Sequence, residues 1–172
     1  MVAITGGPCG GKSSFVEAAR KLLADHGIQV IVVSEMATEL ITAGITPWGK
    51  LGGQEFQQQL MRFLLLREDL YVDMARKLSE HGPVVILCDR GALDAAAYVS
   101  AEDFDRVLGS LETTYGTLRH RYDLVIHLVT AADGAEAAYT LANNTARTEY
   151  QKLRVPLMGV PRSLGWDIPT IM

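Results

Sequence analysis

The sequence holds little of several features that mark specialised protein classes. Its 172 residues include only two cysteines, Cys9 and Cys88, which lie far apart and form no CxxC pair. Two such cysteines cannot supply the disulfide framework of a small secreted domain, so we expect a reducing, cytoplasmic setting. No segment approaches the ~20 uninterrupted apolar residues that a transmembrane helix requires. The residues after Met1 lack the charge pattern of a signal peptide.

Basic charge is also scarce. Lys and Arg number 16 against 20 Asp and Glu, which gives a formal net charge of -4. A nucleic-acid binder usually carries a basic stripe, so no nucleic-acid partner is expected. The apolar fraction of 48% and the charged fraction of 21% are those of an ordinary globular protein. The length is that of a single domain, without repeats or low-complexity tracts.

Short β-type runs alternate with helical patterns along most of the chain. Strands are predicted at residues 2–5, 28–34, 84–88 and 123–130, and helices at 13–26, 36–43, 54–80, 93–99 and 102–115. Residues 134–153 are predicted to form a further helix or a lid. This alternation predicts an α/β fold, a three-layer αβα sandwich with a mainly parallel sheet. In the longest helix, one apolar stripe is predicted through Phe56, Leu60, Phe63, Leu64, Leu70, Met74 and Leu78.

The first predicted strand leads into a glycine-rich motif. Residues 6–13 read GGPCGGKS and match the P-loop pattern GxxxxGK[ST] in full. Glycines allow a tight turn whose backbone N–H groups point at phosphate oxygens, and the following helix presents its positive dipole end to the same anion. Lys12 would reach the β- and γ-phosphates, and the Ser13 hydroxyl would bind Mg²⁺. The predicted phosphate-binding residues are Gly6, Gly7, Pro8, Cys9, Gly10, Gly11, Lys12 and Ser13.

Two acidic residues follow other predicted strands. Asp89 comes directly after the strand at 84–88, where a P-loop enzyme needs a carboxylate for Mg²⁺, and Arg90 would steady phosphate charge. An Asp-Arg turn with only a structural role is the alternative. Glu35 ends the strand at 28–34 and is either the base toward an acceptor hydroxyl or a helix N-terminal acid. Arg147 is either a lid arginine over the γ-phosphate or part of a solvated Arg-Glu pair.

Aromatic residues are few, at 7% of the chain. Trp48, Tyr71 and Tyr98 are candidates for the lining of an acceptor pocket or for core packing, with core packing favoured. His127 lies inside a strand pattern and is expected to pack in the sheet. The other histidines have no metal-ligand spacing.

Taken together, five sequence blocks resemble a known family. ITGGPCGGKSS, VSEMATEL, CDRGALDAAAY, DLVIHLVTAA and LANNTARTE follow the order of AAA-like, kinase-related P-loop domains. That group includes the nucleotide-binding domain of the TRPL translocation defect protein and resembles nicotinamide riboside kinases. The resemblance covers about residues 2–149 and implies strand order 2-3-1-4-5 with ATP or GTP and Mg²⁺. It extends the phosphate-binding segment to Ser14, and implies a Mg²⁺-side acid at Asp89, an acceptor-side acid at Glu35 and a lid arginine at Arg147.

The C-terminal segment departs from this pattern. The family usually continues into a helix and a fifth strand, whereas residues 155–172 contain Pro156, Pro161 and Pro169 between stretches too short for regular elements. The sequence therefore predicts a P-loop domain over residues 1–154 and an irregular tail over 155–172, consistent with a truncated or variant form. This prediction puts the fifth strand and the base specificity in doubt.

Two classes of function follow from these residues. The first is a Mg²⁺-dependent phosphotransferase acting on a small nucleoside-like acceptor, or a related NTP hydrolase, with Asp89 or Glu35 as the base. It predicts an acceptor cavity between residues 35–53 and the turn at Asp89. The alternative is a regulatory switch module that binds GTP or ATP, hydrolyses it slowly and engages a protein or lipid partner. An enzyme is favoured.

Overall fold

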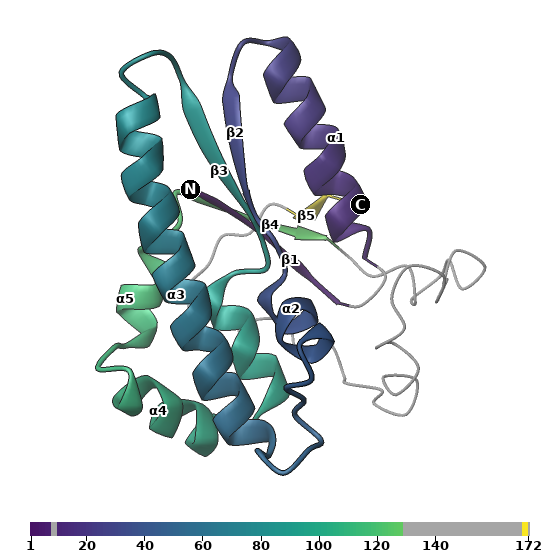
Figure 1. The fold of residues 1–172 in the computed structure, drawn as a ribbon, viewed down its shortest axis with the longest axis vertical. Coiled ribbons are helices and arrows are strands. Elements are labelled where there is room, and N and C mark those ends of the chain that lie inside the picture. The colour runs from purple at the N-terminus through teal and green to yellow at the C-terminus, as the bar shows by residue number, and fades with distance from the viewer. Residues whose placement is uncertain (8–9, 129–169, 172) are drawn as a thin grey trace, which may run out of the picture.

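A computed structural model describes residues 1–7, 10–128 and 170–171 (Figure 1). The strands are β1 (Val2–Gly6), β2 (Gln29–Val33), β3 (Val84–Asp89), β4 (Leu124–Leu128) and β5 (Thr170–Ile171). The helices are α1 (Lys12–Asp25), α2 (Met36–Thr42), α3 (Gly53–Leu78), the 3₁₀ helix η1 (Ala92–Tyr98), α4 (Ala101–Ser110) and α5 (Tyr115–Arg119). Among the described residues, no helix has the length and apolar composition that crossing a bilayer requires.

The five strands form one sheet in the order β2-β3-β1-β4-β5, and every neighbouring pair is parallel. This confirms the α/β fold class and the strand order 2-3-1-4-5. Because all strands run the same way, β1, β2 and β3 end at one edge of the sheet. That edge receives Gly6, Glu35 and Asp89, and it is where ligands collect in folds of this kind.

The fifth strand corrects the prediction of an irregular tail at two positions. Thr170 pairs with His127, and Ile171 pairs with Leu128. Both residues are β-branched and suit a strand. A two-residue strand is too short for hydrophobic periodicity to reveal, so it could not be predicted from the sequence pattern. The other tail residues lie outside the described part of the chain.

Helices cover both faces of the sheet. Alternate strand residues point to opposite sides, so each face has apolar side chains that pack against helices. On one face, Ile4 and Leu87 are buried together with Val16 of α1. On the other face, Ala3 and Cys88 belong to a larger cluster that includes side chains of α3, η1, α4 and α5. Figure 1 shows α1 and α3 on opposite sides of β2 and β3.

Two helical predictions differ from the structure in form. The helix predicted over residues 102–115 ends earlier than expected, because α4 stops at Ser110 and the next helix, α5, begins only at Tyr115. The gap between them falls where Glu112 adopts a left-handed conformation, with φ 51°, and where the Thr114 side chain caps α5 by accepting a hydrogen bond from the Thr117 backbone N–H. The helix predicted over 93–99 is the 3₁₀ helix η1. The other predicted helices and strands that lie within the described residues have bounds within two residues of those observed.

The single apolar stripe predicted on α3 is wrong. Phe56 and Leu64 are buried, but Phe63, Leu70 and Met74 are 50%, 49% and 52% exposed. Apolar residues occur on more than one side of this helix, and periodicity cannot tell which side meets the sheet. Trp48, for which core packing was favoured, is 49% exposed.

Gly6 ends β1 in a conformation and a space that only glycine fits. Its φ is 141°, and a Cβ at this position would lie 2.3 Å from the backbone carbonyl oxygen of Leu128 on β4. We therefore predict that Gly6→Ala lowers the free energy of unfolding by about 1–3 kcal/mol, because the two strands must separate. Urea denaturation measures this difference.

Gly109→Ala is the matched control. Gly109 lies within α4, and a Cβ there meets no atom within 4 Å. The substitution should raise stability by about 0.5–1 kcal/mol, the usual gain from replacing glycine inside a helix. A Gly6→Ala protein as stable as the wild type would contradict the close approach of β1 and β4.

Candidate functional site

The P-loop connects β1 to α1. Gly11 is the N-cap of α1 with φ 74°, a left-handed conformation that favours glycine, and its carbonyl oxygen accepts a hydrogen bond of 2.8 Å from the Phe15 N–H. Gly10 N–H donates to the Gly7 carbonyl at 3.3 Å. The positive end of the helix dipole therefore lies at the carboxyl edge of the sheet, which suits an anion. Pro8 and Cys9 lie outside the described residues.

Lys12 is the first residue of α1, and its side chain turns back onto the loop. The Nζ atom donates hydrogen bonds to the carbonyl oxygens of Gly6 at 2.9 Å and Gly7 at 2.8 Å. The residue is buried, with 8% of its surface exposed. Burial, aided by the nearby Arg90, lowers the pKa of Lys12 to about 8. The ammonium group is thus poorly solvated, and an anion in the loop would stabilise its charge.

Ser13 joins the P-loop helix to the end of β3. Its hydroxyl donates a hydrogen bond of 3.0 Å to one carboxylate oxygen of Asp89. The other oxygen, Oδ1, is buried without a hydrogen-bond partner among the described residues. Burial raises the pKa of the Asp89 carboxyl. Ser14, which the resemblance adds to the phosphate-binding segment, is exposed.

The Ser13 and Asp89 oxygens fit a magnesium ion that is shared with a nucleotide. Mg²⁺ prefers oxygen ligands, and in phosphate sites it takes one or two from protein and the rest from phosphates and water. The described residues contain no cluster of three or more His, Cys, Asp or Glu side chains that could hold a metal by themselves. The donor set therefore suits Mg²⁺ only together with phosphate oxygens.

Glu35 follows β2 at the same edge and is the N-cap residue of α2. One carboxylate oxygen accepts a hydrogen bond from the Arg90 guanidinium, and the other accepts one of 2.7 Å from the Thr38 hydroxyl. Burial opposes ionisation of this carboxyl, but Arg90 and Thr38 outweigh it and hold the pKa of Glu35 below its ordinary value. Glu35 is therefore a carboxylate at neutral pH.

Arg90 is held at the centre of these charges in a strained conformation. Its φ is 87°, which is uncommon for a residue with a side chain. Its backbone N–H donates to the Ile4 carbonyl at 3.0 Å, which continues the β1–β3 ladder into the turn. The guanidinium pairs with Glu35, lies 3.7 Å from an oxygen of Asp94, and stands 5.7 Å from the centre of the Tyr98 ring. These contacts fix its position.

Asp94 is a site residue that the sequence analysis missed. Its Oδ1 accepts a hydrogen bond of 2.6 Å from the Thr5 hydroxyl of β1, and burial raises the pKa of its carboxyl. It lies four residues after Arg90, on η1. That spacing within CDRGALD is the signal that a search for an ion pair on the following helix would have found.

The turn at residues 89–91 is supported from behind by Tyr122. The Tyr122 hydroxyl accepts a hydrogen bond from the Ala92 N–H and donates one to Glu68, both at 2.7 Å. Glu68 lies on α3, is fully buried and pairs through its other oxygen with Arg121 at 2.7 Å. A Cβ on Gly91 would lie 3.5 Å from the Tyr122 ring, so the turn rests on this side chain. The sequence analysis missed Tyr122 and Glu68.

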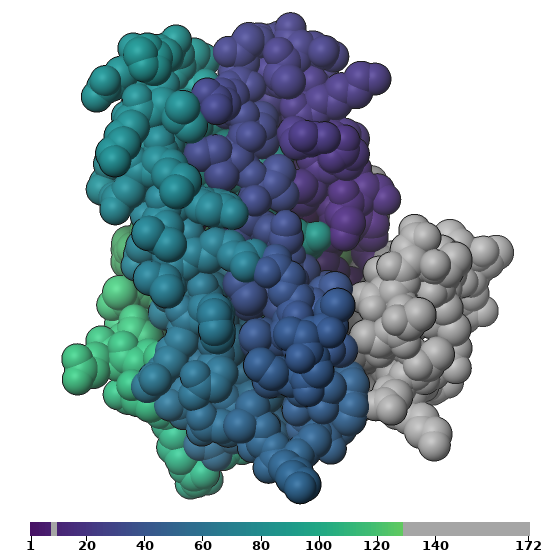
Figure 2. All heavy atoms as spheres, viewed as in Figure 1, coloured from purple at the N-terminus to yellow at the C-terminus, as the bar shows by residue number. Residues whose placement is uncertain are grey.

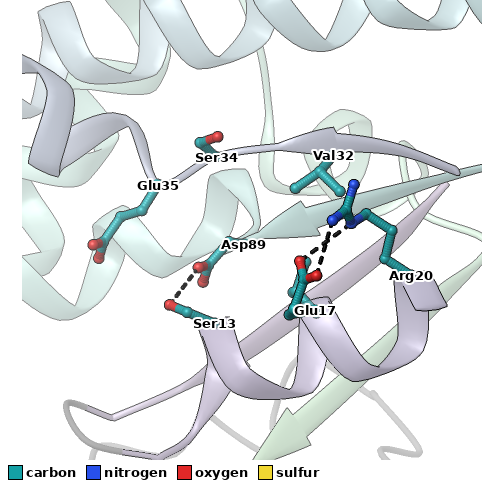
Figure 3. A pocket seen from close by; sticks show the side chains of 8 residues that line it. Ser13, Glu17, Arg20, Val32, Ser34, Glu35 and Asp89 are labelled. Atoms are coloured by element: carbon teal, nitrogen blue, oxygen red, sulfur yellow. Dashed lines mark hydrogen bonds and ion pairs between the residues drawn. The ribbon is translucent and has the colours of Figure 1, made fainter. Parts of the chain in front are cut away.

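A groove of about 300 Å³ opens beside this centre (Figure 3). Ser13 and Asp89 meet at one end of it, and Glu35 lies nearby with its carboxylate turned away from them, as Figure 3 shows. The remaining walls come from α1, from β2 and from the residue that follows β2: Val16, Glu17, Arg20, Val32 and Ser34. The predicted cavity between residues 35–53 and Asp89 is thus only partly matched. Residues 45–53 contribute none of the lining of this groove.

The site brings together most of the residues that the sequence pointed to. Lys12, Ser13, Glu35, Asp89 and Arg90 converge at one sheet edge, and Asp94 joins them. The three carboxylates of this group outnumber its two cations, Lys12 and Arg90, so an added positive ion would be electrostatically favoured. Arg147 lies outside the described residues, so its place stays a prediction.

Removal of the Tyr122 hydroxyl tests the support of the turn. Tyr122→Phe leaves the buried Ala92 N–H without its acceptor and Glu68 without one donor, so we predict a loss of about 1–3 kcal/mol in the free energy of unfolding. Tyr115→Phe is the control, because no hydrogen bond of the Tyr115 hydroxyl occurs among the described residues. Urea denaturation of both variants measures the difference. Equal stabilities would show that the Tyr122 hydroxyl does not hold the turn.

One of two comparisons with known proteins finds a match, and that match agrees with the geometry of the site. A comparison with curated proteins finds no match. A family model described as an AAA domain matches residues 1–157, which include every site residue discussed above. The chain therefore belongs to this AAA-domain family of P-loop nucleotide-binding proteins.

Proposed function

We propose that the protein is a Mg²⁺-dependent phosphotransferase that moves the γ-phosphoryl group of ATP or GTP to a hydroxyl of a small nucleoside-like acceptor. The observation that carries this proposal is the position of Glu35. Nucleotide and Mg²⁺ binding require the P-loop, Ser13 and Asp89. An additional ionised carboxylate, facing the same groove as these residues, suits a second substrate.

The proposed reaction assigns one role to each side chain. The backbone of residues 6–14 and the Lys12 ammonium would bind the phosphates, and Ser13 and Asp89 would hold Mg²⁺, which would neutralise phosphate charge when bound. The acceptor oxygen forms a bond to the γ-phosphorus while the bond to the bridging oxygen of the β-phosphate breaks. The hydroxyl proton passes to Glu35, which is favoured over Asp89 because Asp89 is assigned to Mg²⁺.

Arg90 would stabilise the charge that develops on the transferred group. Its guanidinium is already fixed beside Glu35 and Asp94, so little reorganisation is needed during the reaction. Asp94 would keep the guanidinium in place while Glu35 engages the acceptor. Arg147 is proposed to close over the γ-phosphate from a lid segment.

The acceptor is proposed to be small. A groove of about 300 Å³ lies at the lower end of the range for small-molecule sites. The resemblance of the sequence blocks to nicotinamide riboside kinases supports a nucleoside-like compound. We place the protein in the cytoplasm, because Cys88 is a buried free thiol and few cysteines are present.

A regulatory switch is the second candidate function. It would bind GTP or ATP, hydrolyse it slowly and engage a protein or lipid partner. The resemblance to the nucleotide-binding domain of the TRPL translocation defect protein supports it, as do the exposed apolar side chains of α3. The two functions differ in one measurable respect, because only the phosphotransferase is accelerated by a small acceptor.

The substitution Glu35→Gln tests the reaction. Purified protein is first titrated with ATP and GTP in the presence of Mg²⁺, and then assayed for nucleotide turnover with a panel of nucleosides. We predict that Glu35→Gln lowers the acceptor-dependent kcat by about 10²- to 10⁴-fold, because the general base is lost. Nucleotide affinity should change little. Glu39→Gln is the control, since Glu39 pairs with Arg67 on α3 rather than with Arg90.

Each result of this assay has a distinct meaning. Nucleotide binding with slow turnover that no nucleoside accelerates would contradict the phosphotransferase and favour the switch. Loss of activity in both Glu variants would assign the effect to α2 rather than to the carboxylate of Glu35. Binding of neither ATP nor GTP by the wild type would contradict nucleotide binding itself.

The pH dependence of nucleotide binding tests Lys12. Its pKa is lowered to about 8, and a bound phosphate would raise it again, so binding requires proton uptake above that pH. We predict a constant affinity below pH 8 and a loss of about tenfold per pH unit above it, measured by titration calorimetry. Lys12→Met should bind weakly and lose the pH dependence, whereas a flat wild-type profile would contradict the perturbed lysine.

A further inference from the structure

We propose that the outer face of α3 is the surface through which two copies of this chain pair, with their α3 helices antiparallel. The surface is a stripe of four side chains, Phe63, Leu66, Leu70 and Met74, called here the α3 stripe. They are 50%, 59%, 49% and 52% exposed. Steps of three, four and four residues place them along one side of the helix.

The α3 stripe is not part of the side of α3 that builds the core. Met61, Leu64 and Glu68 lie on the inner side and are buried against the sheet and its neighbours. Figure 2 shows α3 on the near surface of the molecule. A contiguous row of half-exposed large apolar residues is unusual on a soluble monomer, whereas a single exposed residue such as Leu22 of α1 is ordinary.

Charged residues beside the stripe favour a second copy as the occupant. Arg62 and Asp73 are eleven residues apart, about three helical turns, so they lie on the same edge of the stripe. When two identical helices pair antiparallel about a two-fold axis, the same edges face each other with their ends reversed. Arg62 of one copy then lies opposite Asp73 of the other.

One register satisfies both the charged and the apolar contacts. Leu66 lies opposite Leu70 of the second copy and Phe63 opposite Met74, in the same register that brings Arg62 to Asp73. The midpoint of each pair along the helix lies within one residue of Glu68, so a single two-fold axis beside Glu68 relates all three. A parallel pair about a two-fold axis would instead place the two Arg62–Asp73 edges on opposite sides of the interface, where these charges cannot pair. Charge therefore selects the antiparallel arrangement.

The available charges support this pairing over an anionic surface. Among the described residues, no carboxylate lies within ion-pair distance of Arg62. Within the described part of the chain, Asp73 pairs with Arg76 alone, at 3.0 Å, where both side chains are more than half exposed, so this contact contributes little and can be exchanged. The edge carries both signs, with Arg62 and Arg76 at its ends and Asp69 and Asp73 between them, whereas a surface for anionic lipid is rich in Lys and Arg.

Sedimentation equilibrium of the wild-type chain tests the pairing. We expect a monomer–dimer equilibrium at micromolar concentrations, and Leu70→Asp should weaken it by at least about tenfold, because a charge replaces a central apolar contact. Leu22→Asp is the control: Leu22 is an exposed leucine on α1, 60% exposed against 49% for Leu70, and its substitution should leave the dimer unchanged. Circular dichroism and thermal unfolding show whether each variant is folded.

A charge exchange tests the register. Arg62→Asp and Asp73→Arg should each weaken the dimer by about two- to fivefold, and the double variant should restore it, because the opposite charges then face each other again. A double variant weaker than either single one would overturn the antiparallel register. A wild type that stays monomeric at high micromolar concentration, including one that binds neutral lipid vesicles through the stripe, would overturn pairing with a second copy.

Discussion

The whole site depends on the register of β1 between its two neighbours. β1 pairs with β3 so that Ile4 stands beside Asp89, and the Arg90 N–H continues this ladder to the Ile4 carbonyl. The same strand approaches β4 so closely at Gly6 that no side chain fits. This register brings the end of β3 level with the first turn of α1. A shift by one residue would turn Asp89 to the other face of the sheet and separate it from Ser13.

Charges that water would otherwise solvate are held together at this edge. Burial lowers the pKa of Lys12 and raises the pKa of Asp89 and Asp94, so each of these groups gains from an ion of opposite sign. Glu35 differs, because Arg90 and Thr38 already stabilise its charge. Asp94 also lies 3.7 Å from Arg90, which leaves Asp89 as the carboxylate of this site without an ion-pair partner among the described residues. This difference suits the roles proposed for Glu35 as base and Asp89 as Mg²⁺ ligand.

The parts of the fold and site that the sequence predicted are those with local causes. The P-loop is a contiguous motif, and Asp89 and Glu35 each follow an apolar strand, so their common edge follows from parallel pairing alone. Asp94 was missed because its role depends on η1 turning back toward Thr5. Glu68 was missed because an acidic residue on a helix is usually exposed, and only tertiary packing brings Tyr122 and Arg121 to it. The exposed side of α3 was missed because a helix with apolar residues on two sides gives no sign of which one faces the core.

At Arg90 the conformational preference of the backbone and the chemistry of the side chain oppose each other. A glycine adopts φ 87° without strain, whereas an arginine carries a conformational cost of about 1–3 kcal/mol. Without the guanidinium, Glu35 and Asp94 would be left without the cation between them. Stability of the isolated turn and retention of the cation therefore favour different amino acids at this position. At this position the ion pairs of the guanidinium outweigh the conformational strain of the backbone.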